Sequence, residues 1–290
     1  MTQIITSLSE ISSRYKALFV DLWGCVHNGI TAYPEAVAAL QDYRRQGGIV
    51  VLLTNSPKPR LGVAEQLAQF KVPADAYDTI ATSGDSARSA MYLGAVGSKV
   101  YFMGEEERDA GFFEPIQIIE NPVEITRVPL EQAEGIVCCG PMDPHADPDV
   151  NRPAFLYAKQ KGMKLLCANP DIVVDRGEDR EWCAGALARL YTEMGGESLY
   201  FGKPHPPIYD LARRRLAELA NIADEDILCI GDGPHTDISG AMGENLDSLF
   251  ITGGLAAADT GTKHQPDSEK LKTYLAQEKV SPNYSIGFLR

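Results

Sequence analysis

The stretch from Lys16 to Gly29 constrains the fold of this chain most, because a short apolar run there ends abruptly in turn-forming residues. Ala17 to Val20 is too short for a helix, so it predicts a buried strand. Asp21 follows at once, and Gly24 and Gly29 supply turn chemistry. In an open α/β sheet, groups just beyond the carboxyl end of a strand face the crevice where ligands bind. The pattern therefore predicts Asp21 at such a crevice.

Strands alternate with amphipathic helices along the first part of the chain and again after residue 197. This order predicts a parallel sheet with right-handed crossover connections, which is an α/β fold. The expected strands are Ala17–Val20, Ile49–Leu53, Ser198–Phe201, Ile227–Ile230 and Ser248–Thr252, and the expected helices run from Tyr33 to Gln46, Arg60 to Phe70 and Pro206 to Ala220.

The sequence pattern changes between residues 85 and 197, where a second, self-contained α/β unit is expected. A chain of 290 residues is long for one simple domain, so an inserted second domain is a natural organisation. We expect the strands of the insertion at 99–103, 135–139 and 164–168, and its helices at 85–93, 153–160 and 181–194.

The composition narrows the class of protein. A formal net charge of −13 argues against nucleic acid or an anionic membrane surface as partner. The six cysteines lack the paired spacing of a metal site, so we expect buried reduced thiols. The N-terminal residues lack the pattern of a secretory leader, and no stretch has the length of a membrane span. A cytoplasmic protein is therefore expected.

Four predicted strands end in residues that carry chemistry. If these ends share one crevice, they supply a carboxylate nucleophile, a hydroxyl and an amide that hold an anion, a lysine that neutralises it, and acidic ligands for a hard cation. These groups match phosphoryl transfer and few other tasks, because that reaction depends on positioning and on charge neutralisation of the phosphoryl oxygens. The residues concerned are Asp21, Thr54 with Asn55, Lys203, and Asp232 with Asp237.

Other catalytic motifs fail on inspection. Gly231 and Gly233 lack a third glycine at position 236, so they do not form a dinucleotide fingerprint. Gly202 and Lys203 lack the spacing of a P-loop, and a G-x-S-x-G nucleophile elbow is absent from the sequence.

Four segments resemble, in order and spacing, the motifs of the haloacid dehalogenase superfamily: DLWGCVHNG, LLTNSPKPR, FGKPHPPIYDLA and CIGDGPHTDISGA. The third segment and the long insertion resemble subfamily IIA, the NagD-like and p-nitrophenyl phosphatases. The resemblance implies a Rossmann-like core of residues 1–84 and 198–290, with a C2-type cap of residues 85–197 that selects the substrate.

The resemblance also implies a role for each motif residue. Asp21 is implied as the nucleophile, Thr54 and Asn55 as residues that bind phosphate, and Lys203 as a catalytic residue whose charge steadies both the nucleophile and the bound phosphate. A Mg²⁺ cofactor is implied at Asp21, the main-chain carbonyl of Trp23, Asp232 and Asp237. The segment from Cys167 to Gly177 resembles the family's return from cap to core, which would turn Asn169 and Asp171 towards the site.

One position departs from the family pattern. Phosphatases of the family read D-x-D-G, in which the second Asp is the general acid and base, whereas Trp23 stands there in this chain. An indole cannot do either job. His27 is a candidate replacement acid, because its unperturbed pKa of about 6.5 suits the task. An ordinary structural role for His27, and a packing or substrate-stacking role for Trp23, remain open.

These patterns predict a Mg²⁺-dependent phosphatase that acts on a small phosphorylated metabolite, such as a sugar phosphate, through an aspartyl-phosphate intermediate. The alternative is a catalytically impaired protein that binds a phosphorylated ligand for regulation. Turnover separates these two hypotheses. The sequence leaves open whether the chain forms a homodimer.

Overall fold

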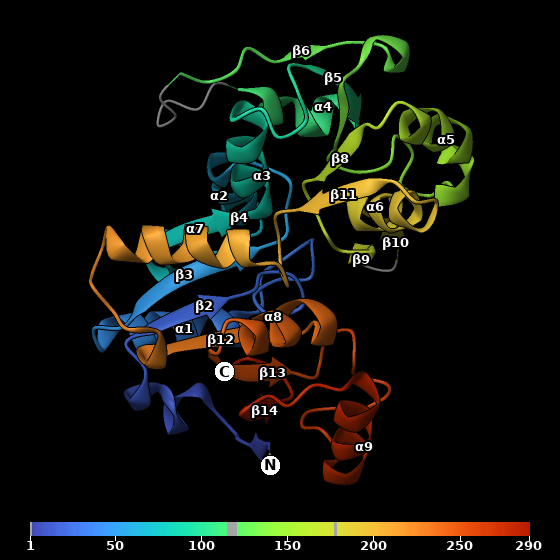
Figure 1. Ribbon diagram of the computed structural model, residues 1–290. Coiled ribbons are helices and arrows are strands. Elements are labelled where there is room, and N and C mark those ends of the chain that lie inside the picture. The colour runs from blue at the N-terminus through green and yellow to red at the C-terminus, as the bar shows by residue number, and fades with distance from the viewer. Residues whose placement is uncertain (1, 115–120, 177–178) are drawn as a thin grey trace. The chain divides into compact units, whose positions relative to one another are not determined.

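A computed structural model describes residues 2–114, 121–176 and 179–290 (Figure 1). The chain forms two compact units. The first unit comprises Met1–Thr54, Ala64–Ala81 and Tyr209–Arg290, and the second comprises Asn55–Val63 and Thr82–Ile208. Both are built on parallel sheets, so the predicted α/β class is confirmed.

The first unit contains a sheet whose described strands follow the order β1-β14-β13-β12-β2-β3-β4. Strand β2 lies between β12 and β3, and all three run parallel, with Val20 opposite both Ile230 and Leu52. Their carboxyl ends therefore meet at one edge of the sheet. The bounds are β1 Gln3–Ile4, β2 Ala17–Val20, β3 Ile49–Thr54, β4 Thr79–Thr82, β12 Ile227–Gly231, β13 Asp247–Ile251 and β14 Tyr284–Ile286.

Helices pack on this sheet through apolar faces that the sequence spacing explains. Helix α1, Pro34–Arg45, begins with proline at its first turn and buries Ala36, Leu40 and Tyr43. Helix α9 contributes Leu271 and Leu275 to a buried cluster that includes Phe250 of β13. The other helices with residues in this unit are α2 Arg60–Gln69, α7 Pro206–Ala217 and α8 Ser239–Gly243, and α9 spans Ser268–Glu278.

The second unit contains a parallel sheet of order β11-β8-β7-β5-β6. Alternate residues of its strands enter two different cores, as the period of two requires. Ile136 and Cys138 of β7 join the core that contains residues of α5 and α6, whereas Val137 joins the core that contains residues of α3. The bounds are β5 Lys99–Met103, β6 Thr126–Arg127, β7 Gly135–Cys138, β8 Lys164–Cys167, β11 Glu197–Tyr200, α3 Ser83–Tyr92, α4 Glu106–Asp109, α5 Arg152–Gln160 and α6 Ala184–Glu193.

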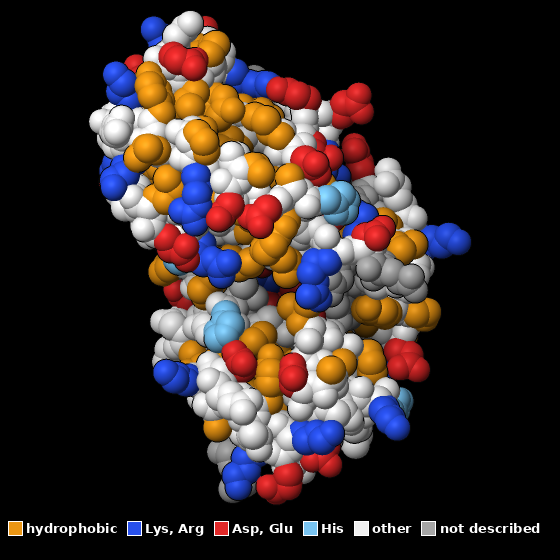
Figure 2. All heavy atoms as spheres, turned by 90° about the vertical axis from the view of Figure 1, so that its right-hand side faces the viewer, with side chains coloured by type: hydrophobic (Ala, Val, Ile, Leu, Met, Phe, Trp, Pro, Cys, Tyr) orange, Lys and Arg blue, Asp and Glu red, His pale blue; other side chains and the backbone are white. Residues whose placement is uncertain are grey.

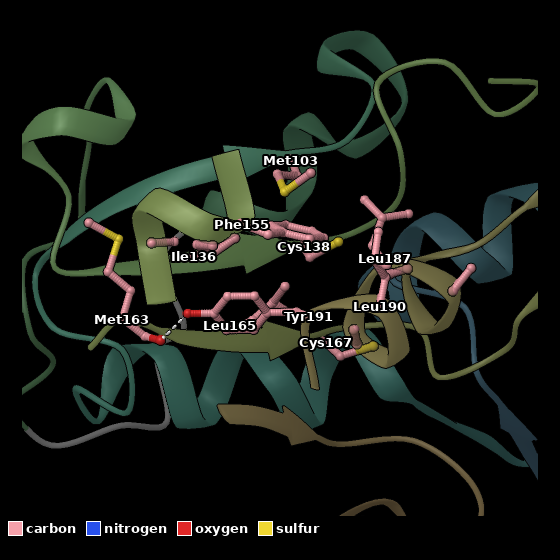
Figure 3. Close-up of a cluster of buried hydrophobic side chains, with 14 residues drawn as sticks. Met103, Ile136, Cys138, Phe155, Met163, Leu165, Cys167, Leu187, Leu190 and Tyr191 are labelled. Atoms are coloured by element: carbon pink, nitrogen blue, oxygen red, sulfur yellow. Dashed lines mark hydrogen bonds between the residues drawn. The ribbon is translucent and has the colours of Figure 1, made fainter. Parts of the chain in front are cut away.

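The larger of these cores is closed by aromatic side chains (Figure 3). Phe155 of α5 and Tyr191 of α6 are fully buried, with ring centroids 5.2 Å apart. The hydroxyl of Tyr191 donates a 2.6 Å hydrogen bond to the carbonyl of Met163, so this buried polar group is satisfied. The insertion therefore has a core of its own.

The structure differs from the sequence-based prediction where the insertion returns. The helix expected from 181 begins instead at Ala184, because β9, Val173–Arg176, and β10, Asp179–Trp182, pair as an antiparallel hairpin. The expected strand at 198–201 pairs with β8 of the second unit. The second unit therefore continues to Ile208, beyond the predicted boundary at residue 197.

The sequence is acidic, with a formal net charge of −13. On the face drawn in Figure 2, basic side chains lie singly among acidic and apolar ones. None of the described helices combines the length and apolarity that a bilayer crossing requires. All six cysteines are buried and form no disulfide, as the sequence predicts.

Candidate active site

Asp21 begins a tight turn at the carboxyl end of β2. Its N–H donates to the carbonyl of Ile230 at 2.8 Å, which extends the pairing of β2 with β12 by one residue. The turn then closes on itself, because Gly24 N–H donates to the carbonyl of His27 and Val26 N–H donates to that of Leu22. The backbone therefore holds the predicted nucleophile in one place.

Asp232, at the end of β12, is enclosed by two glycines. A Cβ at Gly24 would lie 2.2 Å from Oδ2 of Asp232, and one at Gly254 would lie 2.0 Å from the same oxygen. Gly24 also has a φ of +77°, which side chains other than glycine rarely adopt. Leu255 N–H donates to Oδ2 of Asp232 at 3.2 Å. The glycines allow the two loops to approach this carboxylate closely.

Asp21, Cys25 and Asp232 each offer a ligand atom, and these atoms all lie within 4.8 Å of one another. Asp21 and Asp232 are each 7% exposed, and Cys25 is 1% exposed. Two buried carboxylates this close favour a cation between them, since burial weakens the screening of their repulsion. Carboxylate oxygens are the protein ligands that Mg²⁺ prefers, so the two carboxylates of this group fit the predicted ion.

Asp237 forms hydrogen bonds within the loop that carries Asp232. Its Oδ2 accepts hydrogen bonds from Gly233 N–H at 3.0 Å and from the Thr236 hydroxyl at 3.3 Å. A Cβ at Gly231 would lie 2.1 Å from its Cγ. Among the described residues, Asp237 is not grouped with the three ligands above. Its role as a metal ligand stays a prediction.

Trp23 lies against Gly29 and His27. A Cβ at Gly29 would lie 2.2 Å from Cζ2 of the indole, and Gly29 has a φ of +83°. The ring of His27 meets the indole edge-on with centroids 5.3 Å apart, and its other neighbour is Phe70 at 4.9 Å. At the position predicted to replace the family's second Asp, the half-buried indole packs against a histidine and a glycine.

His27 is an unsuitable replacement for that acid. It is 3% exposed, and its Nδ1 accepts a 3.0 Å hydrogen bond from the N–H of Gly29. Burial lowers the pKa of His27 to about 4. The imidazole is therefore neutral at neutral pH, with one nitrogen already occupied, and this surrounding favours the structural role over the catalytic one.

The second unit joins Asn55, Lys203 and Asp171 by hydrogen bonds. Oδ1 of Asn55 accepts from Lys203 N–H at 2.7 Å, and its Nδ2 donates to the Lys203 carbonyl at 3.1 Å. The same Nδ2 donates to Oδ1 of Asp171 at 2.8 Å. The N–H of Gly185, in α6, holds the carbonyl of Asp171 at 3.1 Å. One predicted phosphate ligand thus fixes the backbone of another.

Thr54 is buried at the end of β3 in the first unit, directly before Asn55 in the chain. Asn169 accepts the N–H of Asp171 at 3.0 Å, so its side chain shapes the loop that carries Asp171. Gly177, the end of the predicted segment, lies outside the described residues.

Sequence reasoning missed two neighbours of the carboxylates. Cys25 was expected only as one of six buried reduced thiols, yet its sulfur lies with the two carboxylates. Tyr33 is half-buried, and its pKa is raised by burial and then by the charges of Cys25 and Asp232. Its position follows from a 2.8 Å hydrogen bond of its N–H to the Val26 carbonyl, a pairing that the sequence gives no sign of.

Two family models match the chain at the segments that carry these residues. One, described as a haloacid dehalogenase-like hydrolase, matches residues 18–114. The other, described as HAD-hydrolase-like, matches residues 200–275. Together they cover all four predicted motifs.

Proteins of known name resemble the chain over most of its length. A crystal structure of a haloacid dehalogenase-like hydrolase from Brucella suis is 36% identical, with a TM-score of 0.85, and the match covers 99% of this chain and 100% of that one. The 5'-nucleotidase YutF of Bacillus subtilis is 25% identical over 90% of this chain and 94% of its own. The human glycerol-3-phosphate phosphatase is 27% identical over 93% of this chain and 87% of its own.

These names lend no support to the alternative of a protein that only binds a phosphorylated ligand. The family predicted from the four motifs is confirmed by the full-length match at 36% identity. The chain belongs to the haloacid dehalogenase-like hydrolase family and is an enzyme of its phosphatase kind.

Proposed function

We propose that this enzyme is a Mg²⁺-dependent phosphatase of a small phosphorylated metabolite, with Asp21 as the nucleophile. The observation that carries the proposal is the placement of Asp21 and Asp232 at the ends of adjacent parallel strands, with ligand atoms within 4.8 Å. The named relatives act on small phosphate esters, a nucleotide and glycerol phosphate, which supports this substrate class.

In the proposed reaction, a carboxylate oxygen of Asp21 attacks phosphorus in line with the leaving oxygen and forms an aspartyl phosphate, which water then hydrolyses. Thr54 and Asn55 bind the phosphoryl oxygens, and Lys203 neutralises their charge. Asn55 can hold Lys203 in place for this role, because both oxygen and nitrogen of its amide bind the Lys203 backbone. These roles follow the resemblance of the motifs.

Asp21, the Trp23 carbonyl and Asp232 would hold the Mg²⁺, with Asp237 as the further ligand predicted from sequence. A bound Mg²⁺ supplies charge neutralisation of the phosphoryl oxygens. The residues around Asp232 fit this role, because Gly24 and Gly254 leave space beside its carboxylate that a Cβ would fill. We also propose that the second unit is the C2-type cap that selects the substrate.

Trp23 sets the kind of ester that reacts well. Without a carboxylic acid at this position, the leaving oxygen departs unprotonated, so esters with stable leaving anions, such as aryl and acyl phosphates, should react faster than alkyl phosphates. Loss of a general acid slows proton-dependent steps by about 10² to 10⁴. The enzyme should therefore be slow on ordinary sugar phosphates and faster on an aryl phosphate.

A turnover screen tests the proposal. Purified protein is incubated with a panel of phosphorylated metabolites and with p-nitrophenyl phosphate, and released phosphate is measured with Mg²⁺ and with chelator. We expect release that requires Mg²⁺ and disappears in Asp21→Asn. Release that persists in Asp21→Asn, or none from any compound by a folded wild-type protein, would overturn the proposal.

A further inference from the structure

Cys25 adds a sulfur to a pair of carboxylates that serve Mg²⁺ without it. Mg²⁺ binds oxygen ligands, whereas thiolates select softer cations such as Zn²⁺. The sulfur lies within 4.8 Å of a ligand oxygen of Asp21 and of Asp232, and all three side chains are more than nine-tenths buried. The donor set is therefore that of a mixed oxygen and sulfur site.

The turn fixes the thiol in this position. Gly24 adopts a φ of +77° and approaches the carboxylate of Asp232 so closely that a Cβ would overlap its Oδ2. On the other side of Cys25, the Val26 N–H is bonded to the Leu22 carbonyl at 2.8 Å. Since backbone contacts hold both neighbours, the turn fixes the Cα of Cys25 beside the carboxylates.

We infer that Cys25 gives this site a second occupant, a thiophilic divalent cation such as Zn²⁺ or Cd²⁺, held by its sulfur together with Asp21 and Asp232. The inference rests on the proposed function only for the statement that Mg²⁺ uses the same carboxylates. Binding forms a metal–sulfur bond and releases the thiol proton to solvent. The cation competes with Mg²⁺ and engages the nucleophile, so it inhibits turnover.

The geometry is within reach of such a cation. Zn²⁺ binds sulfur at about 2.3 Å and carboxylate oxygen at about 2.0 to 2.2 Å, so its tetrahedral ligands lie about 3.5 Å apart. The ligand atoms here, within 4.8 Å of one another, need to close by at most about 1.3 Å. Rotation of the carboxylates supplies a movement of this size.

Cadmium absorption tests the inference without any turnover. Metal-free, full-length protein is titrated with Cd²⁺ while the ultraviolet charge-transfer band of a cadmium–thiolate bond is recorded. We expect the band in wild type, its loss in Cys25→Ser, and its suppression by excess Mg²⁺. In calorimetry, Cys25→Ser should weaken Zn²⁺ binding by about 10 to 100-fold or more and leave Mg²⁺ binding within about twofold.

Cys229→Ser is the matched control, because Cys229 is also buried in the first unit, on β12, and lies outside the ligand group. It should keep the band. A band that persists in Cys25→Ser, or is lost equally in Cys229→Ser, contradicts the inference. If Cys25→Ser does not fold, ¹¹³Cd resonance of the native protein decides, since sulfur-bound cadmium resonates far downfield of an all-oxygen site.

The outcomes separate this inference from the proposed function. A cadmium–thiolate band in a protein that releases no phosphate supports the inference and overturns the phosphatase proposal. Mg²⁺-dependent phosphate release by a protein that shows no cadmium–thiolate band supports the phosphatase proposal and overturns the inference about Cys25.

Discussion

Nδ1 of His27 accepts the N–H of Gly29 at 3.0 Å, so the proton of the neutral imidazole lies on Nε2. The side chain thus closes the turn after the nucleophile. Asn at this position can place an acceptor near Nδ1, so His27→Asn should keep phosphate release within about tenfold of wild type, whereas loss of a general acid costs about 10² to 10⁴. A larger loss in kcat, with an unchanged circular dichroism spectrum, would mean that His27 is the acid.

The same histidine makes stability depend on pH. Its pKa is near 6.5 in the unfolded chain and is lowered to about 4 by burial, so the unfolded state binds more protons between these values. The free energy of unfolding should therefore fall by up to about 3 kcal/mol as the pH falls from 6.5 to 4. His27→Asn should lose this component in denaturant titrations. The exposed His145→Asn should retain it.

Gly29 should be indispensable for the position of Trp23. Gly29→Ala adds a Cβ that overlaps the indole and strains a φ of +83°, so the variant should unfold more easily and displace the ring. Gly47→Ala is the matched control, since Gly47 has a φ of +93° and a Cβ added there would meet none of the described atoms within 4 Å. This variant should lose only about 1 to 2 kcal/mol of stability through backbone strain. Indole fluorescence in a Trp182→Phe background reports the displacement, and equal effects of the two variants would contradict the contact.

Restoring a carboxylate at position 23 tests the role of the missing acid. Trp23→Asp should raise turnover of an alkyl phosphate more than that of an aryl phosphate, by up to about 10² to 10⁴, because only the alkyl oxygen needs a proton. Trp23→Phe keeps an aromatic ring without the carboxylate and should not change the ratio. A ratio of alkyl to aryl turnover that stays constant in Trp23→Asp would refute this account of Trp23.

Removal of the Asn55 amide should affect both stability and substrate binding. Asn55→Ala leaves the Lys203 N–H without the 2.7 Å acceptor it has in the structure, at a cost of about 1 to 3 kcal/mol. It should also lower kcat/KM for phosphate esters. Asn151→Ala is the control, since it removes a 3.1 Å hydrogen bond to the Pro148 carbonyl. It should lower stability less than Asn55→Ala and leave kcat/KM unchanged. Unchanged kcat/KM in Asn55→Ala would remove it from the phosphate site.

Local patterns in the sequence predicted most of the strands that position the site. Ala17–Val20 and Lys99–Met103 were predicted with the bounds they have, because short apolar runs end there in turn residues. The adjacency of Asp21 and Asp232 followed from the parallel sheet, since the carboxyl ends of neighbouring strands share one edge.

Features that depend on pairing between distant or polar segments were missed. The β9–β10 hairpin has only a short apolar run at Val173 and Val174, and its Glu181 is held by Arg176 and Arg108. The approach of Cys25 to the carboxylates depends on the positive φ of Gly24, which sequence spacing does not encode. Helix α9 did have a local signal, since the Asp267 side chain accepts from the N–H groups of Glu269 and Lys270.

Mass spectrometry of the phosphorylated intermediate tests the nucleophile most directly. Wild-type protein with Mg²⁺ is quenched in acid during turnover of an aryl phosphate and digested with pepsin at acidic pH, because an acyl phosphate hydrolyses at the pH that trypsin requires. We expect a phosphoryl group on Asp21, in the fragment that contains this residue, and none in Asp21→Asn. Phosphate release without a label on this fragment, or a label that persists in Asp21→Asn, would contradict the assignment of Asp21 as the nucleophile.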